Sequence, residues 1–308
     1  MKKKLLLIDT FNFLHRAYHA IPKTIRDQEG NPTNAVYGIT SMLINILNVV
    51  KPDYVITALD DITPTFRVDK FTGYKAHRKP MENDLSSQIP KVFEVIDAFG
   101  VKKIVLPGYE ADDVIGTAVH RFKDSDLDII IVSNDRDLWQ LLDVNVAIMI
   151  SLKGGKIERV GFEEAKKKLG FDPKDIVDYK GLRGDPSDNI PGVYGVGDKT
   201  AKKLLYRFNS IDGVYKNIDK VEPESLRKKL SEGYEQAIMS RQLAEIIVDA
   251  PMSVELDECK YTAFNKALVK KVLERYNFKS LIKRLGLEVR NEPAKFKQKV
   301  HENQLKLF

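Results

Sequence analysis

The sequence predicts an α/β fold, with a mostly parallel central sheet covered by helices on both faces and a helical domain after it. In the first half, short aliphatic runs alternate with longer amphipathic stretches. The runs are apolar at almost every position, which is typical of strands buried on both faces. From about Phe162, helical patterns separated by Gly and Pro replace the strands. A length of 308 residues suits about two such domains.

Five strands are expected in the first half, over residues 4–9, 54–60, 103–106, 127–133 and 144–150. One helix is marked clearly over residues 110–122. Its apolar residues recur with the helical period and form one stripe: Ala111, Val114, Ile115, Ala118, Val119 and Phe122. Alternating strands and helices predict a doubly wound sheet, in which ligands bind at the carboxyl ends of the strands.

Composition excludes several classes of protein. Hydrophobic residues make up 43% and charged residues 31%, unlike a disordered or fibrous chain. The longest apolar runs are far shorter than the roughly 20 residues of a membrane span. A single cysteine, Cys259, excludes an internal disulfide, and the histidines have no zinc-site spacing. We therefore expect a cytoplasmic globular protein with no membrane contact, and the net charge of +6 is compatible with a polyanionic partner.

Acidic residues stand where the expected strands end. Asp9 and Asp60 close two strands, and Asp135 and Asp137 follow a third. The carboxyl ends of parallel strands share one edge of a sheet, so these four side chains are expected to gather there. Five more acids stand at the start of helix 110–122 and in the motif at 184–189: Glu110, Asp112, Asp113, Asp185 and Asp188.

Any one of these acids taken alone is most simply a turn former or a helix cap. Nine in one cleft would repel each other and raise their own pKa values unless cations neutralise them. Oxygen ligands without His or Cys favour Mg²⁺ or Mn²⁺ over zinc. A site this rich can hold two ions, which together stabilise the attacking and leaving oxygens of phosphodiester hydrolysis.

A basic segment follows the second strand. Between residues 67 and 79, five basic side chains (Arg67, Lys70, Lys75, Arg78 and Lys79) outnumber one acid, and Phe71 and Tyr74 are interleaved with them. Cations that track phosphates and rings that stack on bases suit single-stranded nucleic acid. On composition alone, a solvated charged loop is the simpler interpretation.

A glycine-rich element, residues 192–203, resembles a nucleotide-binding P-loop only superficially. Asp198 intrudes between Gly197 and Lys199, and no buried strand precedes the element. We expect its glycines to turn tightly and to offer backbone N–H groups to a phosphate at the start of a helix near Asp198. The residues expected to contact a duplex are Gly192, Gly195, Gly197, Lys199, Thr200, Lys202 and Lys203.

The ordered motifs together resemble a known family. They are Asp9, Asp60, Gly-Tyr-Glu-Ala-Asp-Asp-Val (108–114), Ser-Asn-Asp-Arg-Asp-Leu-Trp-Gln-Leu-Leu (133–142) and Gly-Asp-Pro-Ser-Asp-Asn-Ile-Pro-Gly-Val (184–193). This set is similar to the 5′-to-3′ exonuclease domain of bacterial DNA polymerase I, the bacterial branch of the flap endonucleases, over about residues 4–287. The resemblance implies a resolvase-like (PIN-like) nuclease core that removes 5′ flaps and RNA primers and leaves a 5′-phosphate and a 3′-hydroxyl.

The resemblance also implies roles for residues. Seven acids would surround mainly a first ion (Asp9, Asp60, Glu110, Asp112, Asp113, Asp135 and Asp137), with Asp185 and Asp188 toward a second. Residues 73–78 resemble the family's arch, where Lys75 and Arg78 would hold the scissile phosphate and stabilise charge in the transition state. From the basic and aromatic composition of residues 67–79, Arg67, Phe71 and Tyr74 are expected to contact the DNA strand.

Residues 192–203 resemble the family's helix-hairpin-helix clamp, which grips duplex DNA without reading its sequence and often holds a K⁺ ion. Phosphate contacts fix position but carry no base code. We therefore expect recognition of DNA structure, such as flaps, nicks or RNA primers, with strong salt dependence.

The expected organisation is a nuclease core over residues 1–178 with an arch at 64–85, a helical DNA-binding domain over 179–290, and a tail over 291–308. The tail ends in Gln304, Leu305, Leu307 and Phe308, which resemble a sliding-clamp-binding peptide. A tail that folds back through these apolar side chains is the alternative. We expect a free-standing monomer, with a piece of a longer polymerase as the alternative.

Two other functions remain to be weighed. A non-catalytic module that binds DNA structures is disfavoured because none of the nine carboxylates is missing. A metal-dependent nuclease of RNA is disfavoured because such an enzyme has no need of the helical domain and its glycine turn.

Overall fold

A six-stranded sheet forms the centre of the computed structural model, which describes residues 2–61, 63–151 and 156–288. The strand order is β3-β2-β1-β4-β5-β6. Five strands are parallel: β1 (Lys3–Asp9), β2 (Tyr54–Leu59), β3 (Lys102–Val105), β4 (Leu127–Val132) and β5 (Val146–Ser151). The sixth, β6 (Ile157–Val160), pairs antiparallel with β5 at the edge and was not expected from the sequence. The expected α/β architecture is confirmed, with strand ends within two residues.

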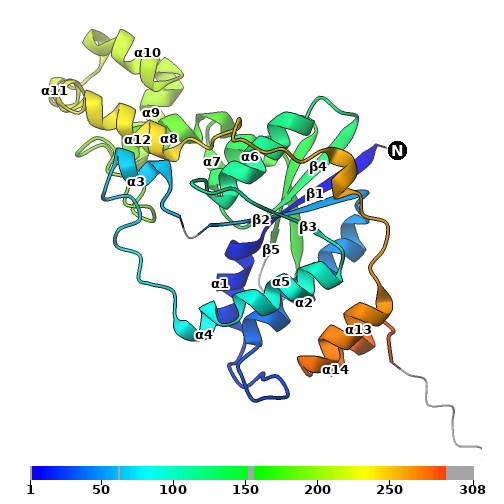
Figure 1. The fold of residues 1–308 in the computed structure, drawn as a ribbon. Helices are drawn as coiled ribbons and strands as arrows, with labels where there is room; N and C mark the ends of the chain where they lie inside the picture. Colours follow the sequence, from blue (N-terminus) through cyan, green and yellow to red (C-terminus); the bar gives the residue numbers. More distant parts are fainter. Residues whose placement is uncertain (1, 62, 152–155, 289–308) are drawn as a thin grey trace, which may run out of the picture.

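Alternating side chains of the strands build two cores. In β1, Leu6 and Ile8 join the core on one face, whereas Leu5 and Leu7 join the core on the other. The first face is covered by α1 (Thr10–Ala20), α2 (Asn34–Val50) and α5 (Ile89–Ala98), and the second by α6 (Ala111–Phe122). Figure 1 shows these helices on opposite sides of the sheet. Burial on both faces explains why the strand sequences are continuously apolar.

Helix α6 confirms the stripe expected over residues 110–122, because all six of its apolar residues are buried. Its first turn carries Asp112 and Asp113, and Glu110 caps it. The N-terminus of α6 therefore places three acids at the carboxyl edge of the sheet. The helix dipole favours negative charge at that position.

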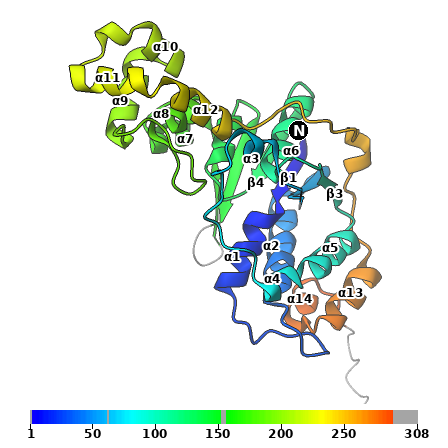
Figure 2. The ribbon, with the colours of Figure 1, turned by 60° about the vertical axis from the view of Figure 1, so that its left-hand side comes forward.

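The arch segment, residues 64–85, connects β2 to α5. It contains the short helix α3 (Phe66–Lys70), and its end overlaps the short helix α4 (Asn83–Ser86). In both views α3 lies beside the helical part of the chain and α4 lies near α1, so the arch segment runs along one side of the molecule (Figures 1 and 2).

The helical part follows β6. It consists of α7 (Phe162–Leu169), α8 (Ile176–Arg183), α9 (Asp198–Phe208), α10 (Ile211–Lys216), α11 (Glu224–Glu232) and α12 (Tyr234–Ala244), with short 3₁₀ turns. A separate core holds α8 to α12 together, through residues such as Leu182, Leu205 and Leu230. The helix expected to start near Asp198 is α9.

The last two described helices return to the α/β part. Helices α13 (Lys266–Arg275) and α14 (Lys279–Arg284) fall in the range expected for the helical DNA-binding domain. Instead, Val269, Leu273 and Leu281 join the core that α2 and α5 build. Figure 2 shows α13 and α14 at the opposite end of the molecule from α9 to α11. Helical periodicity marks an apolar face but does not tell which core that face joins.

The chain between α12 and α13 crosses directly over α6. Ala250 N donates to Thr117 Oγ1 at 3.1 Å, which fixes the crossing. Gly116 makes the close approach possible, because a Cβ atom there would lie 2.5 Å from Ile246 Cγ2 and 2.9 Å from Ile247 O. The helical part is thus tied to the helix that carries three of the acids.

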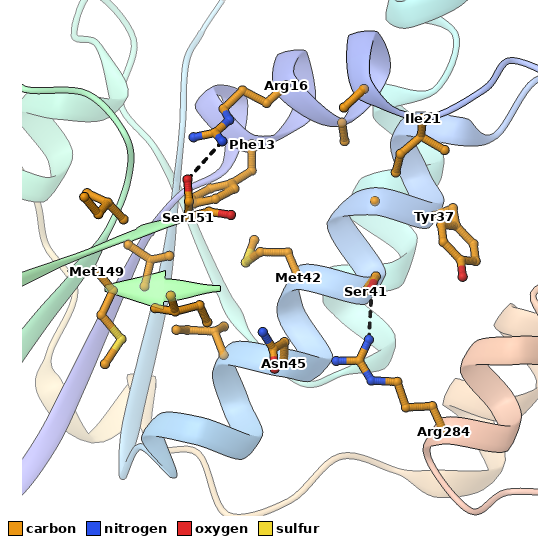
Figure 3. A pocket seen from close by; sticks show the side chains of 17 residues that line it. Phe13, Arg16, Ile21, Tyr37, Ser41, Met42, Asn45, Met149, Ser151 and Arg284 are labelled. Atoms are coloured by element: carbon orange, nitrogen blue, oxygen red, sulfur yellow. Dashed lines mark hydrogen bonds between the residues drawn. The ribbon is translucent and has the colours of Figure 1, made fainter. Parts of the chain in front are cut away.

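An apolar groove of about 730 Å³ lies between α1, α2 and β5. Figure 3 shows Phe13, Met42 and Met149 lining it, with Arg16 bonded to Ser151 and Arg284 bonded to Ser41. None of the nine acids lines this groove, so it is separate from the acidic edge of the sheet. Among the described helices, none is both long and apolar enough to cross a membrane.

We expect Gly116→Val to destabilise the protein by about 1–3 kcal/mol, because the added methyl groups must displace Ile246 and the backbone of Ile247. Urea unfolding measures the loss. The matched control is His120→Val on the exposed side of the same helix, which should cost less than about 0.5 kcal/mol. Equal stability of the two variants would contradict the close approach.

Candidate metal centre

The ends of three neighbouring strands build the first part of the site. Asp9 ends β1 and also caps α1, since its Oδ1 accepts from Asn12 N at 3.2 Å. Ser133, just after β4, donates from Oγ to Asp9 Oδ2 at 2.7 Å. Asp60 follows β2, and its Oδ1 accepts from Ala111 N at 2.7 Å at the start of α6. Because β1 lies between β2 and β4, these contacts hold the acids along one edge.

Burial and mutual repulsion disfavour the charged forms of these carboxyls. Burial is the main cause that raises the pKa of Asp9 to about 7, and the charges of Asp60 and Asp135 add to it. Burial also raises the pKa of Asp112 well above its usual value, followed by the charges of Asp135 and Asp9. A nearby cation stabilises the charged forms of carboxyls that are buried and repel one another in this way.

The second part of the site is a compact trio of carboxylates. One oxygen from each of Asp137, Asp185 and Asp188 lies within 4.8 Å of the other two. Asp137 begins the 3₁₀ turn η1 (Asp137–Leu141), and the other two follow α8. The resemblance had grouped Asp137 mainly with the first ion, whereas the structure groups it with Asp185 and Asp188. Three hard oxygen ligands at this spacing fit a divalent cation such as Mg²⁺.

A tight backbone turn holds Asp185 and Asp188. Asp185 and Ile190 exchange two backbone hydrogen bonds, each 2.8 Å long. Gly184 has φ +77°, and Gly192 has φ +63° with its Cα packed so closely that a Cβ would lie 2.1 Å from Gly184 N. Only glycine fits both demands at Gly192.

Within the described part of the chain, four cationic side chains contact the nine acids: Lys75, Arg78, Lys180 and the buried Arg67. Lys75 Nζ lies 2.8 Å from Glu110 Oε1, and Arg78 Nη2 lies 2.6 Å from Asp188 Oδ1. Lys180 Nζ bonds to both Asp137 and Asp185. The sequence indicated Lys75 and Arg78 by resemblance, but Lys180 was missed. It stands five residues before Asp185 in an ordinary helical pattern, so no sequence signal marked it.

Arg67 and Asp113 form a buried ion pair, which corrects two expectations. Both Asp113 oxygens accept from the Arg67 guanidinium at 2.7 Å. The Asp113 carboxylate also accepts from Glu110 N at 3.0 Å and from Ile247 N at 2.9 Å. Arg67 is 2% exposed and Asp113 is 0% exposed. Since its partners already occupy both oxygens, Asp113 is placed as a structural residue rather than a metal ligand, and Arg67 does not reach the surface as a DNA contact must.

Tyr74 and Phe71 also lie differently from the expectation of base stacking. Tyr74 is 5% exposed and belongs to a small apolar cluster with Ile190 and Leu243, against which Phe71 packs. The Tyr74 hydroxyl donates to Glu110 Oε2 at 3.1 Å. Its ring therefore packs under the arch segment in this structure and is not available to stack on a nucleic-acid base.

The glycine-rich element presents a mixed surface. Gly192 is buried and donates from its N to Ser240 Oγ at 3.0 Å, whereas Gly195 and Gly197 are exposed. In the first half of α9, Lys199 and Lys203 are exposed, and Thr200 and Lys202 are half-buried. Lys202 pairs with Asp198 at 3.1 Å.

Two exposed tyrosines beside these lysines were missed. Tyr194 is 87% exposed in the glycine turn and Tyr206 is 91% exposed on α9. The spacing of Tyr206, three and four residues after two lysines on one helix, was the available signal. Of the remaining expected residues, Gln304, Leu305, Leu307 and Phe308 lie outside the described residues.

Removing one partner of the buried ion pair should be costly. We expect Arg67→Met to destabilise the protein by about 3–5 kcal/mol, because the Asp113 charge would stay buried without its partner. The double variant with Asp113→Asn should lose clearly less than the sum of the two single variants. Urea unfolding of all four proteins measures this coupling, and additive losses would contradict a structural ion pair.

Comparison with known proteins supports the family resemblance. A family model described as the N-terminal resolvase-like domain of 5′-3′ exonucleases matches residues 4–170. A second model, their C-terminal SAM fold, matches residues 171–267. DNA polymerase I of Caldicellulosiruptor bescii is 42% identical over 287 residues, covering 92% of this chain and 34% of the relative. DNA polymerase I of Bacillus subtilis is 40% identical over 286 residues, covering 92% and 32%. The chain thus spans about a third of the length of these curated relatives.

Solved structures share the fold at low identity. The bacteriophage T5 D15 flap endonuclease, in a complex with DNA and metal ions, has a TM-score of 0.69 at 18% identity and covers 89% of this chain and 100% of its own. The catalytic core of Rad2 in complex with a DNA substrate has a TM-score of 0.58 at 17% identity, covering 92% and 93%. Since the two family models together match residues 4–267, this chain belongs to the 5′-3′ exonuclease family.

Proposed function

We propose that this chain is a structure-specific 5′ nuclease, acting as a 5′-3′ exonuclease and 5′-flap endonuclease on DNA in primer removal and repair. The observation that carries the proposal is the acidic edge of the sheet, whose Asp137, Asp185 and Asp188 oxygens lie within 4.8 Å of one another. The T5 neighbour with this fold is described as a flap endonuclease in a complex with DNA and metal ions, which supports the same class of substrate.

Two groups of carboxylates would hold two Mg²⁺ or Mn²⁺ ions. One group comprises Asp9, Asp60 and Asp135, which stand at or just after strand ends, and Asp112 in the first turn of α6. The other group is the trio of Asp137, Asp185 and Asp188. Glu110, which interacts electrostatically with Asp60 and Asp112, stands beside the first group. When bound, such ions lower the pKa of water and neutralise charge on the transferring phosphate.

Lys75 and Arg78 would hold the scissile phosphate. Both come from the arch segment and reach the acids, Lys75 at Glu110 and Arg78 at Asp188. A phosphate that approaches the acidic edge would therefore meet two cationic side chains, and each carries hydrogen-bond donors for phosphate oxygens. Their charges would stabilise the negative charge that develops on the phosphate in the transition state.

The start of α9 is the proposed grip on the duplex. Exposed Gly195 and Gly197, with Lys199 and Lys203, can meet phosphates without reading bases. Tyr194, exposed in the same turn, extends this surface. A K⁺ ion in this turn belongs to the proposal by family resemblance. Binding through phosphates makes the affinity fall with salt, and recognition would depend on DNA structure.

Interaction with the bacterial sliding clamp through Gln304–Phe308, and action in the cytoplasm as a monomer, complete the proposal. The clamp peptide rests on the sequence resemblance alone. Clamp binding is compatible with flap cleavage, because the clamp would bring the nuclease site to nicks and flaps at replication forks.

The direct test uses a 5′-labelled double-flap DNA and an equal blunt duplex, each with Mg²⁺ or with EDTA, followed by mapping of the product ends. We expect Mg²⁺-dependent cutting near the flap junction that leaves a 5′-phosphate on the downstream strand. Tight flap binding without any cleavage would instead favour a DNA-structure binding module. Preferred turnover of single-stranded RNA would favour the RNA nuclease.

In the same assay, Asp112→Asn should reduce cleavage by at least about a hundredfold while DNA binding persists, because it removes one carboxylate of the first group. The matched control is Asp126→Asn, at a side chain that is 83% exposed beside the amino end of β4. It should cleave like the parent protein. Full activity of Asp112→Asn in Mg²⁺ would sink the assignment.

For the tail, deletion of residues 304–308 should leave the cleavage of short flap oligonucleotides unchanged and abolish binding to a bacterial sliding clamp. Surface plasmon resonance with immobilised clamp measures the binding. Replacing only Leu307 and Phe308 by Ala provides a minimal variant of equal length. Equal clamp affinity with and without the five residues would refute the peptide's role.

A further inference from the structure

Lys180 is a cation inside the acidic site. Its Nζ bonds to one oxygen of Asp137 and to one of Asp185, which belong to the trio of carboxylates. The Lys180 side chain is only 12% exposed, and the two carboxylates are 18% and 11% exposed. Unlike Lys75 and Arg78, which the arch segment carries, Lys180 comes from within helix α8.

The trio needs positive charge to persist as a cluster. Three carboxylates whose oxygens lie within 4.8 Å repel one another strongly. Arg78, which belongs to the arch segment, forms an ion pair with Asp188. Lys180 forms ion pairs with the other two acids, Asp137 and Asp185. Lys180 is therefore the part of the counter-charge that the folded body of the protein supplies, independent of the arch segment.

We infer that Lys180 is a built-in counter-ion that competes with a divalent cation for Asp137 and Asp185, and so sets the cation concentration at which this trio is filled. The inference rests on the proposed function in one respect, the assignment of the trio to a divalent ion. Lys180 is a positioning residue in this scheme, because it acts through the carboxylates.

Competition follows from the two carboxylates that Lys180 shares with the trio. A divalent ion must approach its carboxylate ligands to about 2.0–2.6 Å. The Lys180 ammonium already contacts the same two carboxylates. Two cations cannot share those contacts without repulsion, so binding of the ion requires the ammonium to move away. The lysine side chain is a flexible four-carbon stem, and rotation about its bonds lets the ammonium move while α8 stays in place.

Mn²⁺ binding to the whole chain without DNA tests this competition. Electron paramagnetic resonance of free Mn²⁺ gives the affinity of each site for the parent protein and for Lys180→Met. We expect the weaker of the two Mn²⁺ sites to bind Mn²⁺ at least about tenfold more tightly in Lys180→Met than in the parent protein. The reason is that the variant removes a positive charge close to the ion. Unchanged or weaker binding would overturn the inference.

Arg183→Met is the matched control, because it removes a positive charge from the same helix. The Arg183 guanidinium lies over the Tyr179 ring, 5.7 Å from its centroid. Its loss should change the Mn²⁺ affinity by less than about threefold, as expected for a charge screened by solvent. A gain equal to that of Lys180→Met would reduce the effect to general electrostatics and contradict competition for shared ligands.

Reductive methylation of the parent protein provides a measurement that needs no variant. Mass spectrometry would compare the labelling of Lys180 in EDTA with that in Mg²⁺, at matched ionic strength. We expect slow labelling in EDTA and faster labelling in Mg²⁺, because the displaced ammonium loses its two carboxylate partners. Equal labelling in both would overturn the inference. Neither measurement uses cleavage, so a failure of nuclease activity is distinguishable from a failure of this inference.

Discussion

Repulsion among carboxylates at one edge of a parallel sheet is the constraint on which the rest of the structure depends. The strand order places the ends of β2, β1 and β4 side by side. Asp9 ends β1, Asp60 directly follows β2, and Asp135 lies three residues after the end of β4. The N-terminus of α6 and the turn after α8 add more acids to the same edge. Such a concentration of charge persists only with cations nearby, and within the described chain these are Arg67, Lys75, Arg78 and Lys180.

The same residues tie the arch segment to the helical part. Lys75 N donates to Asp188 O at 2.9 Å, and Asn189 Nδ2 donates to Gly73 O at 2.6 Å. Lys75 takes φ +53° at this junction, a conformation uncommon for a side-chain-bearing residue. Tyr74 packs against Ile190 and Leu243 in the small apolar cluster at this junction. Ions that bind the acids would therefore act on contacts that also set the position of the arch segment.

Much of the architecture could be predicted from the sequence because burial on both faces leaves a strong pattern. Leu5 to Ile8 are apolar without interruption since alternate residues enter different cores. The edge strand β6 was missed, as a short strand with Glu158 and Arg159 at its centre lacks that pattern. The packing of α13 on the core that α2 and α5 build could not be predicted from the sequence either. An apolar helix face would fit this core or the core of the helical part.

For the site, the sequence located the acids but not their partners. Asp112 and Asp113 are adjacent and chemically identical, yet successive helix positions point in different directions. Asp113 consequently meets Arg67 in the interior, while Asp112 interacts with Asp135 and Asp9. Lys180 was missed for a related reason, since a lysine in a helix is ordinarily a solvated side chain. Pairings between distant residues are set by tertiary contacts that motif order does not contain.

Anomalous diffraction from crystals of the chain soaked in Mn²⁺ tests the metal assignment most directly. We expect two peaks at the acidic edge, one in contact with Asp137, Asp185 and Asp188 and one among Asp9, Asp112 and Asp135, with the Lys180 ammonium displaced from its two carboxylates. Mn²⁺ bound only elsewhere, with Lys180 still between Asp137 and Asp185, would contradict it.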